Sequence, residues 1–95
     1  MVSSYFEWSE EKNKLLRQER EISFEEVILA ITNGDLLDVI ENPNQKKYPS
    51  QKIFVVDIGG YVYLVPFVKN KDKYFLKTIF PSRKMTEEYL IKKRR

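Results

Sequence analysis

The chain has 95 residues, of which 42% are hydrophobic and 33% are charged, and its net charge is +3 at pH 7. This length predicts a single domain over residues 1–95, large enough to fold around one core without disulfides or metals. The absence of cysteine and histidine excludes disulfides, thiolate nucleophiles, Ser-His-Asp triads and the usual zinc sites.

Membrane segments and nucleotide cofactors are also not expected. No stretch approaches the roughly 20 apolar residues that cross a bilayer, and the opening Met-Val-Ser-Ser lacks the apolar core of a signal peptide. We therefore expect a cytoplasmic protein. Gly34, Gly59 and Gly60 each suit a turn or a helix end rather than a phosphate-binding loop, so no cofactor or metal is expected.

Two helices are predicted after a short edge strand over Tyr5–Trp8. The first begins at the cap Ser9, carries glutamates in its first turn and runs to about Arg20. Only two of its residues are leucines and none is another large apolar residue. It is therefore expected to bury a thin stripe and to leave its basic side chains, Lys12 among them, in solvent.

The second helix has stronger sequence signals. Ser23 and Glu26 form a capping box, and Ile22 and Val27 occupy the hydrophobic-staple positions. Apolar residues then recur at helical spacing. Gly34 is expected to end the helix in the left-handed conformation.

The next segments predict a strand, a long loop and a three-stranded meander. Asp35–Glu41 is the strand, and Asn42–Ser50, with the pair Lys46-Lys47, is the loop. Loops of this length are often functional or mobile. The meander strands are rich in Val, Ile, Phe and Tyr and span Lys52–Ile58, Tyr61–Val68 and Lys73–Phe80.

The turns of the meander set its register. Gly59-Gly60 suits a type I′ turn, and Asn70-Lys71-Asp72 makes a looser second turn. This pairing puts Tyr63 on a face shared by Phe54, Val56, Ile58, Tyr61, Val65 and Phe67. The opposite face is more aliphatic. We expect the helix pair to cover the aliphatic face, leaving the tyrosine-bearing face partly open or covered by a partner. Lys77 would interrupt the third strand and reach solvent at an edge.

A final short helix is predicted over Glu87–Lys93, capped by Thr86 after Pro81-Ser82 ends the last strand. The basic run over residues 92–95 is either a solvated tail or a nucleic-acid contact. The fold class is thus α+β in the order β-αα-ββββ-α. An antiparallel four- to five-stranded sheet has two N-terminal helices on one face and a short C-terminal helix.

Three segments resemble the BrnT family of bacterial toxins. Phe6–Asn13 resembles that family's aromatic-acidic-Trp-Asp-x-x-Lys-Asn start. Arg20–Glu26 resembles its Lys-His-Gly-Ile-Ser-Phe-Glu-Glu, and Ser82–Thr86 resembles its Ser-Ala-Arg-Lys-Ala-Thr with one residue fewer. The segments occur in the family's order. Two features differ: the family histidine is replaced around Glu19-Arg20-Glu21, and Glu21 stands where the family has glycine.

The resemblance implies a RelE-like fold, RNA cleavage with or without the ribosome, and neutralisation by a small ribbon-helix-helix antitoxin. RNA can be cleaved by its own 2′-hydroxyl, so the protein need only position the strand, stabilise the phosphate and move protons. Arg83 suits the phosphate. Lys84, Lys12 and Lys77 can add positive charge, and Tyr63 can stack a base or donate a proton. Neither metal nor cofactor is required.

A second reading follows from the missing histidine. The chain can instead be a non-catalytic binding module, a degenerate toxin that pairs with an antitoxin or a nucleic acid. In either reading, a heteromeric complex is expected in which the partner packs near Tyr61 and Tyr63 and screens Arg83 and Lys84.

Overall fold

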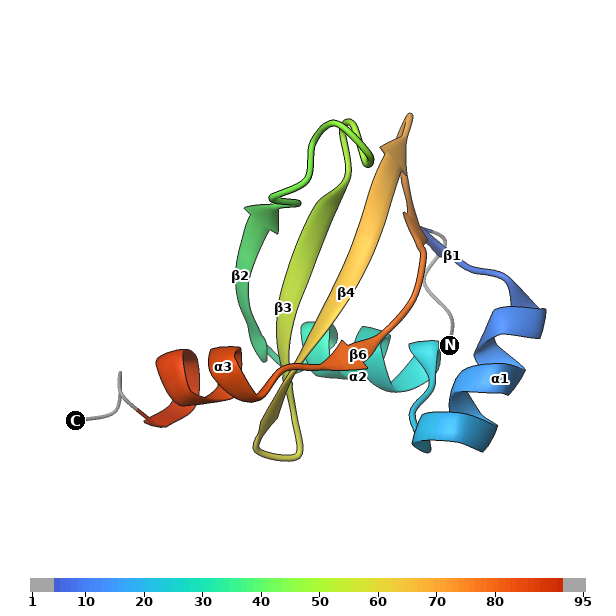
Figure 1. Cartoon of the computed structure of the whole chain (residues 1–95). Helices are drawn as coiled ribbons and strands as arrows, with labels where there is room; N and C mark the ends of the chain where they lie inside the picture. Colours follow the sequence, from blue (N-terminus) through green and yellow to red (C-terminus); the bar gives the residue numbers. More distant parts are fainter. Residues whose placement is uncertain (1–4, 92–95) are drawn as a thin grey trace.

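Two capped helices precede the main strands in the computed structural model, which describes residues 5–91 (Figure 1). α1 (Glu10–Arg20) begins at Ser9, whose Oγ accepts the Lys12 backbone N–H at 3.2 Å. α2 (Phe24–Thr32) begins at Ser23, whose Oγ accepts the Glu26 N–H at 3.3 Å. Both predicted caps are therefore confirmed. Serine is favoured at these positions because its hydroxyl accepts a backbone N–H that has no partner within the helix.

The predicted signals at the two ends of α2 hold with one difference. Ile22 and Val27 are both buried in one core cluster, as the staple requires. Gly34 follows the C-cap Asn33 with φ +88°, the left-handed conformation predicted for it. The Glu26 carboxylate, however, accepts from the Ser23 hydroxyl at 3.3 Å rather than from a backbone amide.

A buried asparagine joins the two helices. Asn13 has no exposed surface. Its Oδ1 accepts the Phe24 N–H at 2.8 Å, and its Nδ2 donates to Glu25 Oε1 at 2.9 Å. One side chain thereby satisfies an otherwise unpaired N–H in the first turn of α2 and ties it to α1.

The sheet of the described residues has six strands in the order β1-β5-β4-β3-β2, with β6 also paired to β4. Their bounds are Phe6–Glu7 (β1), Leu36–Glu41 (β2), Lys52–Ile58 (β3), Tyr61–Asn70 (β4), Lys73–Leu76 (β5) and Phe80–Pro81 (β6). The α+β class is as predicted. The sheet is mixed rather than wholly antiparallel, because β1 runs parallel to β5.

The central hairpin has the predicted register. Gly59 and Gly60 take φ +66° and +87°, the positive values of a type I′ turn. Ile58 pairs with Tyr61, and Val56 pairs with Tyr63.

The third meander strand was predicted to be continuous over Lys73–Phe80, but it is interrupted between β5 and β6. β5 ends at Leu76, which pairs with Phe67, so an unbroken strand would place Ile79 opposite Leu64. Phe80 stands there instead. The chain has therefore gained one residue relative to β4, as in a β-bulge. Lys77 lies in this interruption and is exposed, not in mid-strand.

The helix pair covers the aromatic face of the sheet, so the predicted assignment of faces is wrong. The cluster on that face joins buried residues of both helices to the strands: Leu16, Ile22, Phe24, Val27, Ala30, Phe54, Val56, Val65, Phe67, Leu76 and Ile79. Phe54 of β3 and Phe67 of β4 belong to this cluster, and their rings contact Tyr74 of β5. The aliphatic face, with Ile53, Val55, Val62 and Leu64, packs against Met85, Tyr89 and Leu90 near the C-terminus.

The C-terminal helix begins earlier than predicted. Ser82, not Thr86, is the N-cap of α3 (Arg83–Thr86), and its Oγ accepts the Met85 N–H at 3.1 Å. A π-helical turn, η1 (Glu87–Ile91), continues the helix. Thr86 instead accepts the buried Val62 N–H of β4 at 2.9 Å. The predicted end at Lys93 and the basic run over residues 92–95 lie outside the described residues.

Candidate nucleic-acid interface

Arg83 and Lys84 lie in the first turn of α3, and both are exposed. This turn is fixed to the sheet by backbone bonds, because the Ser82 N–H donates to the Val62 carbonyl at 3.0 Å. The buried hydroxyl of Thr86 holds the next turn to the same strand. The two cations therefore start from a backbone that is positioned by β4.

Tyr63 lies on β4 directly across from Pro81, two residues before Arg83. Its ring is half-buried against the helix-covered cluster, 6.0 Å from the Tyr61 ring. α3 packs on the opposite face through Met85. The structure thus brings the backbones of Tyr63 and α3 together and places the tyrosine ring on the other side of the sheet.

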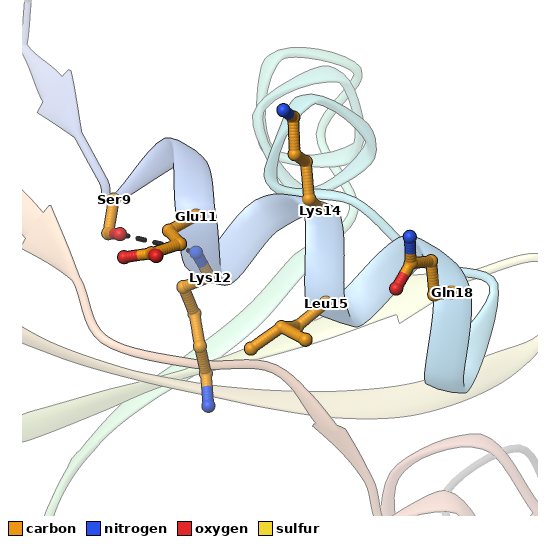
Figure 2. A pocket seen from close by; sticks show the side chains of 6 residues that line it. All are labelled: Ser9, Glu11, Lys12, Lys14, Leu15 and Gln18. Carbon is orange, nitrogen blue, oxygen red and sulfur yellow. Dashed lines mark hydrogen bonds between the residues drawn. The ribbon is translucent and has the colours of Figure 1, made fainter.

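Lys12 and Lys77 belong to other parts of the molecule. Lys12 lines a surface hollow of about 440 Å³ whose other lining residues, Ser9, Glu11, Lys14, Leu15 and Gln18, also belong to α1 and its cap (Figure 2). Lys77 lies beyond β5, with its Nζ 5.3 Å from the centre of the Phe75 ring. The hollow beside Lys12 is lined by none of the other four candidate site residues, Tyr63, Lys77, Arg83 and Lys84.

Arg20 and Glu21, in the segment that stands where the BrnT family has its histidine, help to hold the end of α1 in place. The Arg20 guanidinium donates to the Ile79 carbonyl at 2.6 Å and so ties the end of α1 to the interruption between β5 and β6. Glu21 adopts φ +55° and ψ +39°, the left-handed conformation. Glycine adopts that conformation without strain, and glycine is what the BrnT resemblance places there.

A second hollow, which the sequence reading missed, crosses the helix-covered face at its other end. It measures about 380 Å³ and is lined by Val39, Ser50, Lys52, Phe54, Phe67, Lys69 and Tyr74. We call it the strand groove. These residues come from β2, β3, β4, β5 and the end of the β2–β3 loop. In Figure 1, α2 crosses the sheet near its lower end, α3 extends outward beside that end, and the β2–β3 loop and the β4–β5 turn lie at the upper end.

Aromatic rings form the floor of the strand groove. Phe54 and Phe67 stack with ring centres 3.9 Å apart and planes at 10°. Tyr74 meets both edge-on, with centre distances of 5.9 Å to Phe54 and 5.5 Å to Phe67. The Lys69 ammonium lies 5.7 Å from the centre of the Tyr74 ring. The groove therefore combines ring surfaces with an adjacent cation.

Lysines concentrate around this end of the sheet. Besides Lys52 and Lys69 there are Lys46, Lys47, Lys71 and Lys73, all exposed. Within residues 5–91 the ion pairs join Arg17 to Glu25 and Lys73 to Glu7. The charges of Lys52 and Lys69 are thus not neutralised by an ion pair inside the described part of the chain.

A sequence signal for the strand groove existed. Lys52-x-Phe54 and Phe67-x-Lys69 have period-two spacing, which puts each pair on one face of its strand. The hairpin register pairs Lys52 with Phe67. The spacing within each strand and the predicted register between the strands would together have placed the side chains of Lys52, Phe54, Phe67 and Lys69 next to one another.

The residues with shifted pKa values lie outside both regions. The hydrogen bond from Asn13, and then the nearby charge of Arg17, hold the pKa of Glu25 below its ordinary value. The hydrogen bond to Asp38, 2.7 Å long, raises the pKa of Tyr89.

Among residues 5–91 there is no group of three or more carboxylate, histidine or cysteine side chains that could hold a metal. No helix in this part of the chain has the length and apolar character to cross a membrane.

A family model described as "Domain of unknown function (DUF4258)" matches residues 15–81. Searches of curated proteins and of solved structures found no match. The matched range contains every residue of the strand groove, together with Tyr63 and Lys77. It excludes Lys12, Arg83 and Lys84.

Proposed function

The chain belongs to the family of domains of unknown function DUF4258, and we propose that it is the toxin component of a bacterial type II toxin–antitoxin pair. In this proposal it has a RelE-like fold and cleaves RNA without a metal ion. Its natural partner is a ribbon-helix-helix antitoxin.

The anchored position of Arg83 supports this proposal most directly. Its exposed guanidinium extends from a turn held to β4 by the Ser82 and Thr86 bonds. A rigid support lowers the cost of orienting a catalytic group. The planar guanidinium can donate two parallel hydrogen bonds to phosphate oxygens, and Lys84 adds a second positive charge beside it.

The chemistry asks little more of the protein. The 2′-oxygen attacks the adjacent phosphorus as its proton is removed, and the bond to the 5′-oxygen breaks as that oxygen gains a proton. The products are a 2′,3′-cyclic phosphate and a free 5′-hydroxyl. Arg83 stabilises the charge that develops on the phosphate oxygens in the transition state. Lys12 and Lys77 add charge, and Tyr63 stacks a base or supplies a proton, only where a bound strand reaches them, because all three lie apart from the Arg83 side chain.

The alternative is a binding module without catalysis, and the distribution of these residues favours it. Lys12 lies on α1 and Lys77 beyond β5, and the Tyr63 ring is on the face opposite to α3. A module that holds RNA or an antitoxin needs surface charge but no gathered acid and base.

Expression and cleavage assays separate the two functions. We expect induced expression to arrest growth, and the purified protein to cleave RNA in the presence of a metal chelator and leave cyclic phosphate ends. Arg83→Ala should reduce the rate by about 10²–10³-fold, as for loss of one oxyanion donor. Arg17→Ala, at an exposed arginine of α1, is the matched control. Harmless expression together with intact RNA would refute the enzyme and leave the binding module.

A further inference from the structure

We propose that the strand groove binds single-stranded RNA, with a base against its aromatic floor and the flanking phosphates on Lys52 and Lys69. The inference rests on the proposed function only for the choice of RNA as the nucleic acid. It adds a binding site remote in sequence from Arg83.

The shape and lining of the groove fit a base. Its volume of about 380 Å³ lies in the range of pockets that hold one small ligand, roughly 300–1,000 Å³. Phe54 and Phe67 are 6% and 3% exposed and form a firm floor. Tyr74 is half-buried: its ring lies 5.6 Å from the Phe6 ring, and the residue also lines the groove, where a base can meet it. Bases stack on such rings whatever their sequence, because every base has a π-face.

The charges fit the phosphates of a strand. Lys52 and Lys69 flank the rings from neighbouring strands, and the pleat directs both side chains to the groove face. Neither has an ion-pair partner among residues 5–91. The exposed lysines of the β2–β3 loop and the β4–β5 turn extend the positive surface at the same end of the sheet.

Single-stranded RNA fits better than the alternatives. A duplex keeps its bases stacked inside and presents mainly phosphates and sugars, so it would leave the aromatic floor unused. An acidic peptide would meet the lysines but has no need of the ring cluster. Rings beside cations that have no ion-pair partner among residues 5–91 are the combination typical of surfaces that track single strands.

Binding can be measured apart from cleavage with a fluorescein-labelled 2′-O-methyl RNA single strand, which lacks the attacking hydroxyl. We expect fluorescence anisotropy to show salt-dependent binding. The double variant Lys52→Gln/Lys69→Gln removes two exposed charges, and its affinity should fall about tenfold or more. The slope of log K against log salt should become shallower by about 1.4, the value for two phosphate contacts on a single strand.

The matched control is Lys14→Gln/Gln18→Glu, which lowers the net charge equally at exposed positions of α1. Equal loss of binding in the control and the groove variant would overturn the proposal, because only general charge would then matter.

The stacking contact has its own test. Tyr74→Phe keeps the ring and should bind within about twofold of the unmodified chain, whereas Tyr74→Leu should bind roughly five- to a hundredfold more weakly. Equal binding by a folded Tyr74→Leu would overturn the base contact. Should Tyr74→Leu fail to fold, the lysine variants decide.

Stronger binding of duplex RNA or of poly-glutamate than of the single strand would also overturn the proposal. Cleavage of unmodified RNA is assayed in parallel, so binding without cleavage would refute only the enzyme.

Discussion

Glu21 stands where the BrnT family, which the sequence resembles, has glycine. It follows the last residue of α1 in the left-handed conformation, and the backbone N–H groups of Glu21 and Ile22 both donate to the Leu16 carbonyl. This geometry turns the chain directly into the Ser23 cap of α2. A side chain in the left-handed region costs roughly 1–2 kcal/mol, and glycine avoids that cost. The replacement is therefore expected to weaken the helix junction.

The first prediction is that Glu21→Gly stabilises the protein by about 1 kcal/mol, the strain relieved less the added chain entropy of glycine. Urea unfolding should show a higher midpoint with an unchanged slope. The control Glu19→Gly places glycine inside the last turn of α1 and should destabilise by about 0.5–1 kcal/mol. A Glu21→Gly variant no more stable than the original would contradict the strain at this position.

The second prediction concerns acid stability. Bonds from Asn13 and Arg17 hold the pKa of Glu25 below the ordinary value of 4.5 in the folded state. The folded state thus favours the carboxylate, and its contribution to stability is present above pH 4.5 and lost as the pH falls through the lowered pKa. Because the Glu25 side chain is 47% exposed, solvent screening keeps the effect small.

Urea unfolding at a series of pH values from about 6 to about 3 measures this contribution. Glu25→Gln keeps an acceptor for Asn13 but does not titrate. Its stability should fall less steeply below pH 4.5 than that of the unmodified chain. Parallel pH profiles for the two proteins would show that Glu25 does not contribute.

At the scale of elements, the interruption between β5 and β6 determines how the C-terminal part attaches. Because the chain has one extra residue relative to β4, the Ile79 side chain points into the helix-covered cluster, and the Phe80 side chain points into the aliphatic cluster on the opposite face. The chain then pairs with β4 again at Tyr63 and Leu64 and enters α3. Without this shift Ile79, not Phe80, would face Leu64, and Ser82 would leave the sheet in another register.

The third prediction is that Thr86→Val detaches α3 from the sheet. Valine matches threonine in shape but leaves the buried Val62 N–H without its 2.9 Å acceptor. Leaving a buried donor unpaired costs about 1–3 kcal/mol. Thermal unfolding followed by circular dichroism should show this loss, and Thr86→Ser should retain most of the stability.

Thr32→Val, at an exposed threonine in α2, is the control and should change stability by no more than about 0.5 kcal/mol. If Thr86→Val matched it, the hydroxyl would not hold the element. If Arg83 acts on RNA from this element, Thr86→Val should also slow cleavage.

At the scale of the whole molecule, the sheet separates two apolar cores with different covers. The helix pair lies over the aromatic cluster, and the C-terminal helix lies over the aliphatic cluster. The strand groove and the start of α3, the two basic regions considered above, are at different places on this molecule. The tyrosine-bearing face was expected to be partly open or covered by a partner, but the helix pair packs on it. Tyr61 at the hairpin end is still 37% exposed.

The fourth prediction is that an acidic ribbon-helix-helix protein encoded beside this chain forms a heteromeric complex with it. The partner should contact Tyr61 and screen Arg83 and Lys84. Charge attraction between unlike surfaces mainly accelerates association. Stopped-flow mixing should therefore show an association rate that falls steeply with salt, whereas the dissociation rate changes little. Co-expression should relieve the growth arrest. A stable monomer that binds no such partner would contradict the toxin–antitoxin assignment.

The sequence by itself determined the features that depend on neighbouring residues. Ser9 and Ser23 cap the helices, Gly34 ends α2, and Gly59-Gly60 sets the register of β3 against β4, because each signal acts within a few residues. The candidate cations Arg83 and Lys84 were also identified from sequence, although their roles remain predictions.

Only the tertiary structure decided which apolar face the helices cover. The apolar runs of β3 and β4 are nearly continuous, which makes both faces of the hairpin apolar, so local pattern could not choose between them. The helix residues pack into the cluster that contains Phe54, Val56, Val65 and Phe67, and this packing made that choice. The extra residue before Phe80 and the bond from Val62 to Thr86 likewise depend on β4, which is distant in sequence. The complete strand groove exists for the same reason: Tyr74 of β5 and Val39 of β2 join the side chains of the β3–β4 hairpin only when four strands align.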